Sequence, residues 1–171
     1  GIFQPEGCAV PQTTGTPISL VIFNKDAHSK SYSHLQDVFR PGHGDLTYQK
    51  KYGIRDHRGG GRASARETSA RVAAGAVAKQ LLDRHGMSVQ AYTVALGGIK
   101  AEQRDFAQIE QNRLFCPDNA AAERMEERIR EVRSQGDTLG GIVEIRARCT
   151  IGLGEPVFDK LDAELARALM S

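Results

Sequence analysis

The chain has 171 residues, of which 40% are hydrophobic and 26% are charged, so it is long enough for one domain with a buried core. No window approaches the roughly 18 apolar residues of a membrane-spanning helix, and the N-terminal stretch GIFQPEGCAV lacks the pattern of a signal peptide, so we expect a cytoplasmic protein with no membrane partner. The formal net charge is only +2, and the three cysteines have neither zinc nor disulfide spacing, so we expect no metal site.

The first half of the chain is predicted to contain a strand and a long helix. TPISLVIFN (16–24) is rich in β-branched and aromatic residues and has the length of a strand, and the polar residues 25–33 after it indicate a loop. The helix is indicated by SARETSARVAAGAVAKQLLDRHG (64–86). It begins with a capping box formed by Ser64 and Glu67, and it ends at the glycine Gly86.

The pattern changes again after this helix. SVQAYTVAL (88–96) is predicted to form a strand, and the pair Gly97-Gly98 a turn. A second helix is expected over residues 120–135, with its end at Gly136. One face of this helix is apolar at helical spacing, and its members are Met125, Ile129 and Val132.

The C-terminal part is predicted to add a strand and a helix. GIVEIRARC (141–149) alternates apolar and charged residues, which is the period of a half-buried strand whose charged members face water or a partner. The last helix is expected to start at about Asp159, and its leucines are Leu161, Leu165 and Leu169. Strands and helices are interspersed without strict βαβ alternation or a repeat, so we expect the α+β class in a single domain of residues 1–171.

One segment concentrates positive charge. RDHRGGGRASARET (55–68) has three consecutive glycines directly before the predicted helix, which permits a tight loop of backbone N–H groups at the positive end of a helix dipole. Arg62 and Arg66 lie four residues apart, so both can reach the same oxyanion. Between residues 50 and 71 only two residues are acidic, whereas seven are basic: Lys50, Lys51, Arg55, Arg58, Arg62, Arg66 and Arg71.

These sequence patterns do not identify the anion. The spacing matches neither a P-loop nor the GxGxxG motif of dinucleotide-binding proteins. Three interpretations remain: an anion-binding site, an exposed basic loop with charges pointing outward, and a single-stranded nucleic-acid site in which Tyr48 and Tyr52 stack on bases. A concentrated cluster favours a small phosphorylated or carboxylated ligand, because nucleic-acid binders more often carry a basic face over much of the domain.

A histidine precedes the basic segment. His43 lies in RPGHGD, between a Pro-Gly turn and Asp45. Histidine transfers protons near neutral pH, so His43 is a candidate acid–base group beside an anion site. The alternative is a turn histidine that bonds a backbone group.

Several motifs together resemble one enzyme family. DVFRPGHGDLTYQKKYGIRDHRGGGRASARETSARVAAGAVAKQLL (37–82) is similar to the signature core of the chorismate synthases. Similar stretches of the same family are TTGTPISLVI (13–22), FCPD (115–118), GDTLGG (136–141) and GLGEPVFDKLDAELARALMS (152–171). The combination of RPGH with RGGGRxSARET is highly specific, and the resemblance covers nearly the whole chain.

The resemblance implies a lyase of the shikimate pathway, which serves aromatic amino-acid biosynthesis. Such an enzyme converts 5-enolpyruvylshikimate 3-phosphate to chorismate and phosphate by a 1,4-elimination. The resemblance also implies reduced FMN as cofactor, NADPH as an associated nucleotide, a homotetramer, and a β-α-β sandwich with helices between antiparallel sheets. A non-catalytic module that binds phosphate or nucleic acid is the alternative from a different class.

By the same resemblance, three groups of residues receive roles. His43 corresponds to a histidine that protonates the reduced flavin, and is the predicted catalytic residue. The predicted FMN-binding residues are Arg62, Ala63 and Ser64. The residues predicted to meet the phosphate and carboxylates of the substrate are Arg40, Gly42, Ala65 and Arg66.

Some stretches of the family have no counterpart here. Its GESHG and RRRPG motifs would lie upstream, and its INAVKG-like, KPTSS-like and GRHDP-like segments downstream, so we expect an internal fragment that is weakly active or inactive alone. QPEGCAVPQ (4–12) is longer than the usual linker before TTGT, and Gly44 stands where the family more often has alanine.

Overall fold

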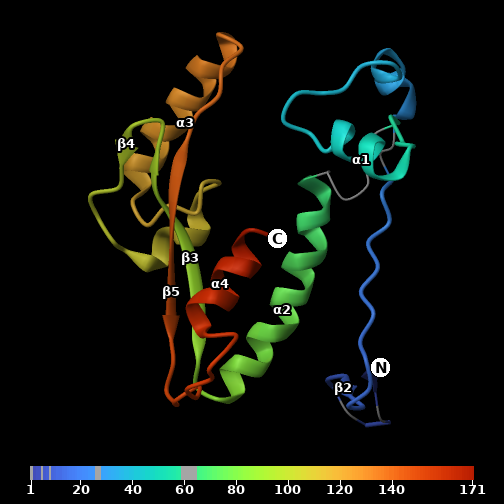
Figure 1. The fold of residues 1–171 in the computed structure, drawn as a ribbon. Helices are drawn as coiled ribbons and strands as arrows, with labels where there is room; N and C mark the ends of the chain where they lie inside the picture. Colours follow the sequence, from blue (N-terminus) through green and yellow to red (C-terminus); the bar gives the residue numbers. More distant parts are fainter. Residues whose placement is uncertain (1, 5, 8, 26–27, 59–64) are drawn as a thin grey trace. The chain divides into compact units, whose positions relative to one another are not determined.

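The chain forms two compact units, residues 1–80 and residues 81–171, and each is described by itself. Helices and antiparallel strand pairs occur in both, which confirms the α+β class, whereas the single domain stays a prediction. Figure 1 shows the computed structural model, and the residues that it describes are 2–4, 6–7, 9–25, 28–58 and 65–171.

The first unit contains short strands and helices. The strands pair antiparallel, with Ile2 opposite Thr13. In chain order the elements are β1 (Ile2–Phe3), β2 (Gln12–Thr13), the 3-10 helix η1 (Ser29–Leu35), α1 (Asp45–Tyr52), the 3-10 helix η2 (Ala65–Glu67) and α2 (Thr68–Arg84), whose last residues belong to the second unit.

The strand predicted over residues 16–24 is wrong. These residues run as an extended trace after β2 and join no ladder with any described part of the chain (Figure 1). Their large apolar side chains from Leu20 to Phe23 are exposed. A strand needs a neighbouring backbone for its N–H and C=O groups, and β-branched composition supplies only the propensity. The predicted loop over residues 25–33 is also interrupted, because η1 begins at Ser29.

Helix α1 is an element that the sequence patterns did not predict. It is short and bounded by glycines: Gly44 precedes it, and Gly53 ends it in the left-handed conformation at φ 73°, with its N–H donating to the Gln49 carbonyl at 2.9 Å. Asp45 in the first turn and two lysines in the last complement the helix dipole. A Cβ on Gly44 would lie 3.0 Å from Cε2 of Tyr48, so the alanine that the family more often has here would press on that ring.

Helix α2 confirms the long helix predicted from the sequence. At its C-terminal end Gly86 adopts φ 67°, and the N–H of Met87 donates to the Leu82 carbonyl at 3.0 Å. This is the left-handed glycine cap that was predicted. At the other end η2 leads into the helix, and the predicted capping residue Ser64 lies outside the described residues.

The second unit is built on a three-stranded antiparallel sheet. β3 confirms the predicted strand at both of its ends, and the Gly97-Gly98 turn connects it to β4. β5 confirms the strand predicted after residue 140, and it pairs with β3 along the length of both. The spatial order is β4-β3-β5, with bounds Ile99–Lys100, Ser88–Leu96 and Gly141–Arg148.

The core of the second unit lies against helix α3 (Asn119–Ser134). As predicted, Met125 and Val132 are buried, while Ile129 is half-buried. The irregular segment before α3 contains the 3-10 helix η3 (Phe106–Gln111). The buried cluster consists of Ala101, Cys116, Ala121, Ala122 and Met125, against which Leu96, Ile99 and Leu114 pack.

The faces of β5 differ from the prediction, because all eight of its residues are exposed and two charged residues contact side chains of the same unit. Glu144 accepts a hydrogen bond from the hydroxyl of the buried Tyr92, and the guanidinium of Arg146 stacks over the ring of Phe106 at 4.8 Å. Val143 and Ile145, expected to be buried, are exposed. The alternating pattern predicted the strand but not the orientation of its side chains. That orientation depends on the hydroxyl of Tyr92 and the ring face of Phe106, which both bind charged groups.

The last helix is α4 (Leu161–Leu169), which begins two residues later than expected because Asp159 has φ 56°. Its three leucines are exposed. No helix in the described part of the chain combines the length and the apolarity needed to cross a membrane.

The Gly97-Gly98 turn permits a test of local packing. Both glycines have positive φ, but a Cβ on Gly97 would lie 2.9 Å from Cγ of Arg128, whereas a Cβ on Gly98 would meet nothing within 4 Å. We expect Gly98→Ala to cost only the left-handed strain, about 1–2 kcal/mol. Gly97→Ala is expected to cost about 1–3 kcal/mol more, because the helix side chain must move. Urea unfolding of both variants measures this, and equal losses would contradict it.

Candidate functional site

One tight turn contains the residues predicted within RPGH (40–43), namely the catalytic His43 and the substrate-binding Arg40 and Gly42. The N–H of His43 donates to the carbonyl of Arg40 at 3.3 Å, and between them Gly42 has φ 69°. Proline at the second position and a left-handed glycine at the third are the residues that a type II turn requires. The turn therefore places Arg40 and the exposed His43 at its two ends, directly before α1.

Asp45 is the acceptor that fixes this turn. Its carboxylate accepts three bonds of 3.0 Å from Arg40: from the backbone N–H and Nε on Oδ2, and from Nη2 on Oδ1. The side chain of Asp45 is only 7% exposed. These hydrogen bonds from Arg40 hold the pKa of Asp45 well below its usual range, and they raise the pKa of the Arg40 guanidinium.

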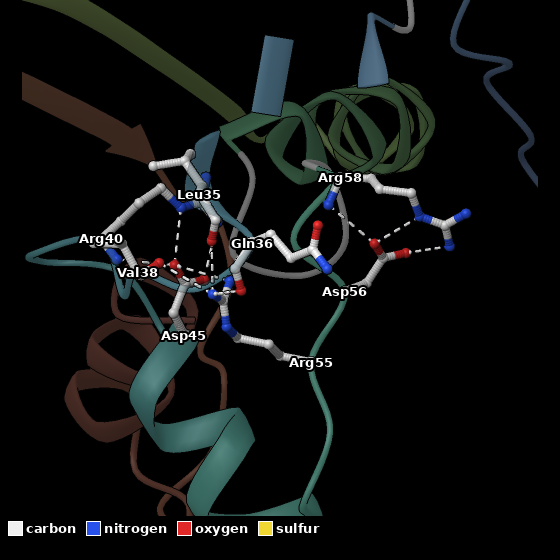
Figure 2. A network of polar contacts seen from close by, with 8 residues as sticks. All are labelled: Leu35, Gln36, Val38, Arg40, Asp45, Arg55, Asp56 and Arg58. Atoms are coloured by element: carbon white, nitrogen blue, oxygen red, sulfur yellow. Dashed lines mark hydrogen bonds and ion pairs between the residues drawn. The ribbon is translucent and has the colours of Figure 1, made fainter. Parts of the chain in front are cut away.

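Arg55 approaches the same carboxylate from a more distant part of the chain. Its Nη1 lies 3.8 Å from Oδ2 of Asp45, and its side chain is 7% exposed. Its Nη2 donates to three backbone carbonyls, those of Leu35 at 2.7 Å, Gln36 at 2.8 Å and Val38 at 3.0 Å. Figure 2 shows the carboxylate of Asp45 near both guanidinium groups, and the three carbonyls around that of Arg55.

A second arginine–aspartate pair lies beside this network (Figure 2) and differs from it in its exposure. Arg58 donates through Nε and Nη2 to the carboxylate of Asp56, both at 2.8 Å (Figure 2). The two side chains are 66% and 57% exposed, so water screens the pair. Because the partners are two residues apart, this pair connects no separate segments of the chain.

The network corrects the interpretation of the basic segment. One of the three interpretations, an exposed basic loop with charges pointing outward, does not hold for Arg55, which is turned inward toward Asp45 and three carbonyls. The physical reason is that a buried guanidinium is tolerated where its donors find acceptors and a counter-charge. Tyr48 and Tyr52, considered for base stacking, lie one helical turn apart with ring centroids at 5.8 Å.

The remaining predicted site residues lie at the start of α2. Ala65 and Arg66 are exposed residues of η2, and the carbonyl of Arg66 accepts from Oγ of Ser69 at 2.7 Å. The predicted FMN-binding residues Arg62, Ala63 and Ser64 lie outside the described residues. The described residues thus bring Arg40, Gly42 and His43 together in one turn.

Sequence reasoning missed the roles of Asp45 and Arg55. A signal was present for Asp45, because an aspartate directly after a turn and before two lysines is typical of the first turn of a short helix. No local pattern could predict the buried contacts of Arg55, since the carbonyls that it binds are 17 to 20 residues away in the chain.

Comparison with known proteins now gives the family. The family model of chorismate synthase matches residues 5–171. The chain is 61% identical over 160 residues to the chorismate synthase of Syntrophobacter fumaroxidans, covering 93% of this chain and 46% of that protein. It is also 61% identical over 160 residues to the chorismate synthase of Desulfatibacillum aliphaticivorans, covering 93% and 45%.

A solved structure supports the same assignment. A crystal structure of chorismate synthase superposes with a TM-score of 0.65 at 32% sequence identity, covering 74% of this chain and 44% of that one. The chain therefore spans about half the length of the relatives that it matches.

Proposed function

This chain belongs to the chorismate synthase family, and from that premise we propose that it forms part of the site where 5-enolpyruvylshikimate 3-phosphate is converted to chorismate and phosphate in the shikimate pathway. The observation that carries the proposal is the turn that sets Arg40 and an exposed histidine, His43, three residues apart. An arginine binds phosphate or carboxylate, and a histidine beside it moves a proton near neutral pH. The whole reaction is proposed for the protein that contains these residues.

Substrate binding is proposed for Arg40, Gly42, Ala65 and Arg66. The substrate carries a phosphate and carboxylates, so it needs cationic and N–H donors. Arg40 keeps 22% of its side chain exposed despite its bonds to Asp45. Arg66 stands in the turn that leads into α2, where backbone N–H groups and the helix dipole favour an anion. Gly42 lets the backbone approach a ligand closely.

Cofactor binding is proposed for Arg62, Ala63 and Ser64. The described residues next to them fit the phosphate of FMN, because η2 and α2 present exposed residues and a helix start with an arginine. Reduced FMN, when bound, supplies electron density to the substrate as phosphate leaves. His43 is proposed to hold, on an imidazole nitrogen, the proton that is exchanged at this site. NADPH use, a homotetramer and a cytoplasmic location are further proposals that follow from the family.

Titration with FMN tests the cofactor proposal. Saturable quenching of flavin fluorescence is expected with the native chain. Arg62→Ala is expected to weaken FMN binding about 10- to 100-fold, since a charge-assisted hydrogen bond is worth roughly 1.5–3 kcal/mol. The control Arg58→Ala removes an exposed arginine of the same segment that is paired with Asp56, and should change the affinity less than about threefold. Equal losses in both variants would indicate bare electrostatics and overturn the assignment.

Turnover is tested with a chimaera. In it, the 171 residues replace the matched region of the Syntrophobacter fumaroxidans relative, to which they are 61% identical. Phosphate release from 5-enolpyruvylshikimate 3-phosphate is measured anaerobically with dithionite-reduced FMN, for the chain alone and for the chimaera. Turnover by the chimaera supports the proposal. A folded chimaera that binds RNA in a salt-dependent manner but releases no phosphate favours the non-catalytic alternative.

A further inference from the structure

We propose that Asp45 and Arg55 are positioning residues that hold Arg40 ready for the anionic substrate. The inference rests on the proposed function, because it assigns to this pair an effect on substrate binding through Arg40. Neither residue is proposed to touch the substrate: each is 7% exposed, whereas Arg40 is 22% exposed.

Asp45 leaves the side chain of Arg40 little conformational freedom. Two side-chain nitrogens and the backbone N–H of Arg40 are all bound to the one carboxylate at 3.0 Å. The guanidinium also lies 5.9 Å from the ring centroid of Tyr32. An arginine held in one rotamer before the ligand arrives loses less side-chain entropy on binding. The low pKa of Asp45 is consistent with a carboxylate that stays ionised for this purpose.

Arg55 places a second buried guanidinium next to Asp45. Nη2 of Arg55 is bound to the carbonyls of Leu35, Gln36 and Val38, and its guanidinium lies 5.1 Å from the ring centroid of Phe39. Its Nη1 faces Asp45 at 3.8 Å and is buried without a hydrogen bond in the described part of the chain. Arg55 thereby ties the segment before the turn to the segment that leads into the glycine-rich stretch (Figure 2).

The network carries more positive than negative charge. Two guanidinium groups share a single carboxylate, so the network keeps one net positive charge. If Asp45 served only to neutralise Arg40, a second buried arginine beside it would be unfavourable. An anionic group bound to the exposed part of Arg40 would offset this surplus positive charge. The nearby pair of Arg58 and Asp56 is already neutral and exposed, and offers no such surplus.

A double-mutant cycle in the chimaera tests the inference. Arg40→Ala is expected to raise KM for 5-enolpyruvylshikimate 3-phosphate about 10- to 100-fold, because a charged contact is lost. Asp45→Asn is expected to raise KM about 10-fold in the native background and less than about twofold in the Arg40→Ala background. KM factors that multiply in the double variant would show that Asp45 does not act through Arg40, and the inference would then fail.

Two further variants separate positioning from a loss of folding. Asp45→Glu keeps the carboxylate and is expected to bring KM back to within about threefold of the native value. If Asp45→Asn does not fold, Arg55→Lys carries the test: it keeps a charge but not the planar fork, and should raise KM about threefold or more while FMN affinity is unchanged. An unchanged KM in Arg55→Lys overturns the inference.

The control is Asp56→Asn, which breaks an arginine pair of the same geometry on the surface. It is expected to leave KM within about twofold, because exposed pairs contribute little. A native chimaera without turnover would mean that the proposed function has failed. If the chimaera turns over but substitution of Asp45 leaves KM unchanged, only the positioning role has failed.

Discussion

Replacing His43 by glutamine is expected to lower kcat for phosphate release by the chimaera about 10²- to 10⁴-fold, which is the usual contribution of a general acid or base. Glutamine keeps polarity and approximate size but cannot move a proton at neutral pH. The imidazole is exposed at the end of the turn, and the hydrogen bond that closes the turn uses the backbone N–H of His43. The fold of the turn should therefore survive, and the loss should appear in kcat rather than in stability or FMN affinity.

His34→Gln is the matched control for this experiment. His34 is an exposed histidine of η1 in the same unit, and no role is proposed for it. It should change kcat less than about twofold, as expected for a surface substitution. A His43→Gln variant that keeps kcat within threefold of the native value would falsify the catalytic assignment and favour the alternative of a turn histidine.

The sequence predicted the second unit well because its signals are local. The strand pattern of β3, the left-handed pair Gly97-Gly98 and the apolar spacing of α3 each depend on neighbours within a few residues. The orientation of the β5 side chains, by contrast, is not determined by neighbours in the sequence. It depends on Tyr92, whose hydroxyl donates to Glu144, and on Phe106, whose ring lies under Arg146; both lie about 40 to 50 residues earlier in the chain.

The first unit was predicted less well, because its structure depends on contacts between residues far apart in the sequence. Residues 16–24 have strand composition, but a strand is a property of a pair of backbones, and no described segment pairs with them. The turn from Arg40 to His43 was predictable from Pro-Gly, and the roles proposed for its residues rest on the family resemblance. The inward rotation of Arg55 was not readable, because only the folded chain brings three carbonyls and Asp45 to one guanidinium.

The largest loss of stability in the second unit is expected from Asp118→Ala. Asp118 precedes α3, is buried, and accepts from three backbone N–H groups: Ala121 at 3.0 Å, Glu102 at 3.0 Å and Gln103 at 3.2 Å. Losing the cap on the buried Ala121 N–H costs about 0.5–2 kcal/mol, and losing the two part-buried bonds from Glu102 and Gln103 adds about 0.5–1.5 kcal/mol each. We therefore expect a loss of about 2–4 kcal/mol in urea unfolding, a large fraction of the stability of an ordinary domain.

Asp105→Ala is the control for the cap itself. Asp105 caps η3 by accepting from the N–H of Ala107 at 3.1 Å, but it is exposed, so water replaces the lost acceptor. Its loss should be about 0.5–1 kcal/mol. Hydrogen exchange gives a second measurement: the amides of Glu102, Gln103 and Ala121 should lose protection in Asp118→Ala and keep it in Asp105→Ala. Equal unfolding free energies for the two variants would show that burial of the cap contributes nothing.

Acid titration separates the contribution of the negative charge of Asp118 to stability from that of its hydrogen-bond geometry. The N–H donors, first that of Ala121, hold the pKa of Asp118 below its usual range in the folded chain. A carboxylate with a lowered folded pKa stabilises the fold above its unfolded pKa of about 3.9, and this stabilisation is lost as the pH falls through the folded pKa. Asp118→Asn keeps one acceptor oxygen without the charge. The difference in unfolding free energy between native and Asp118→Asn proteins should thus be largest near pH 7 and shrink below about pH 4. A difference that stays constant from pH 7 to pH 2 would mean that geometry alone, and not the ionised carboxylate, stabilises the start of α3.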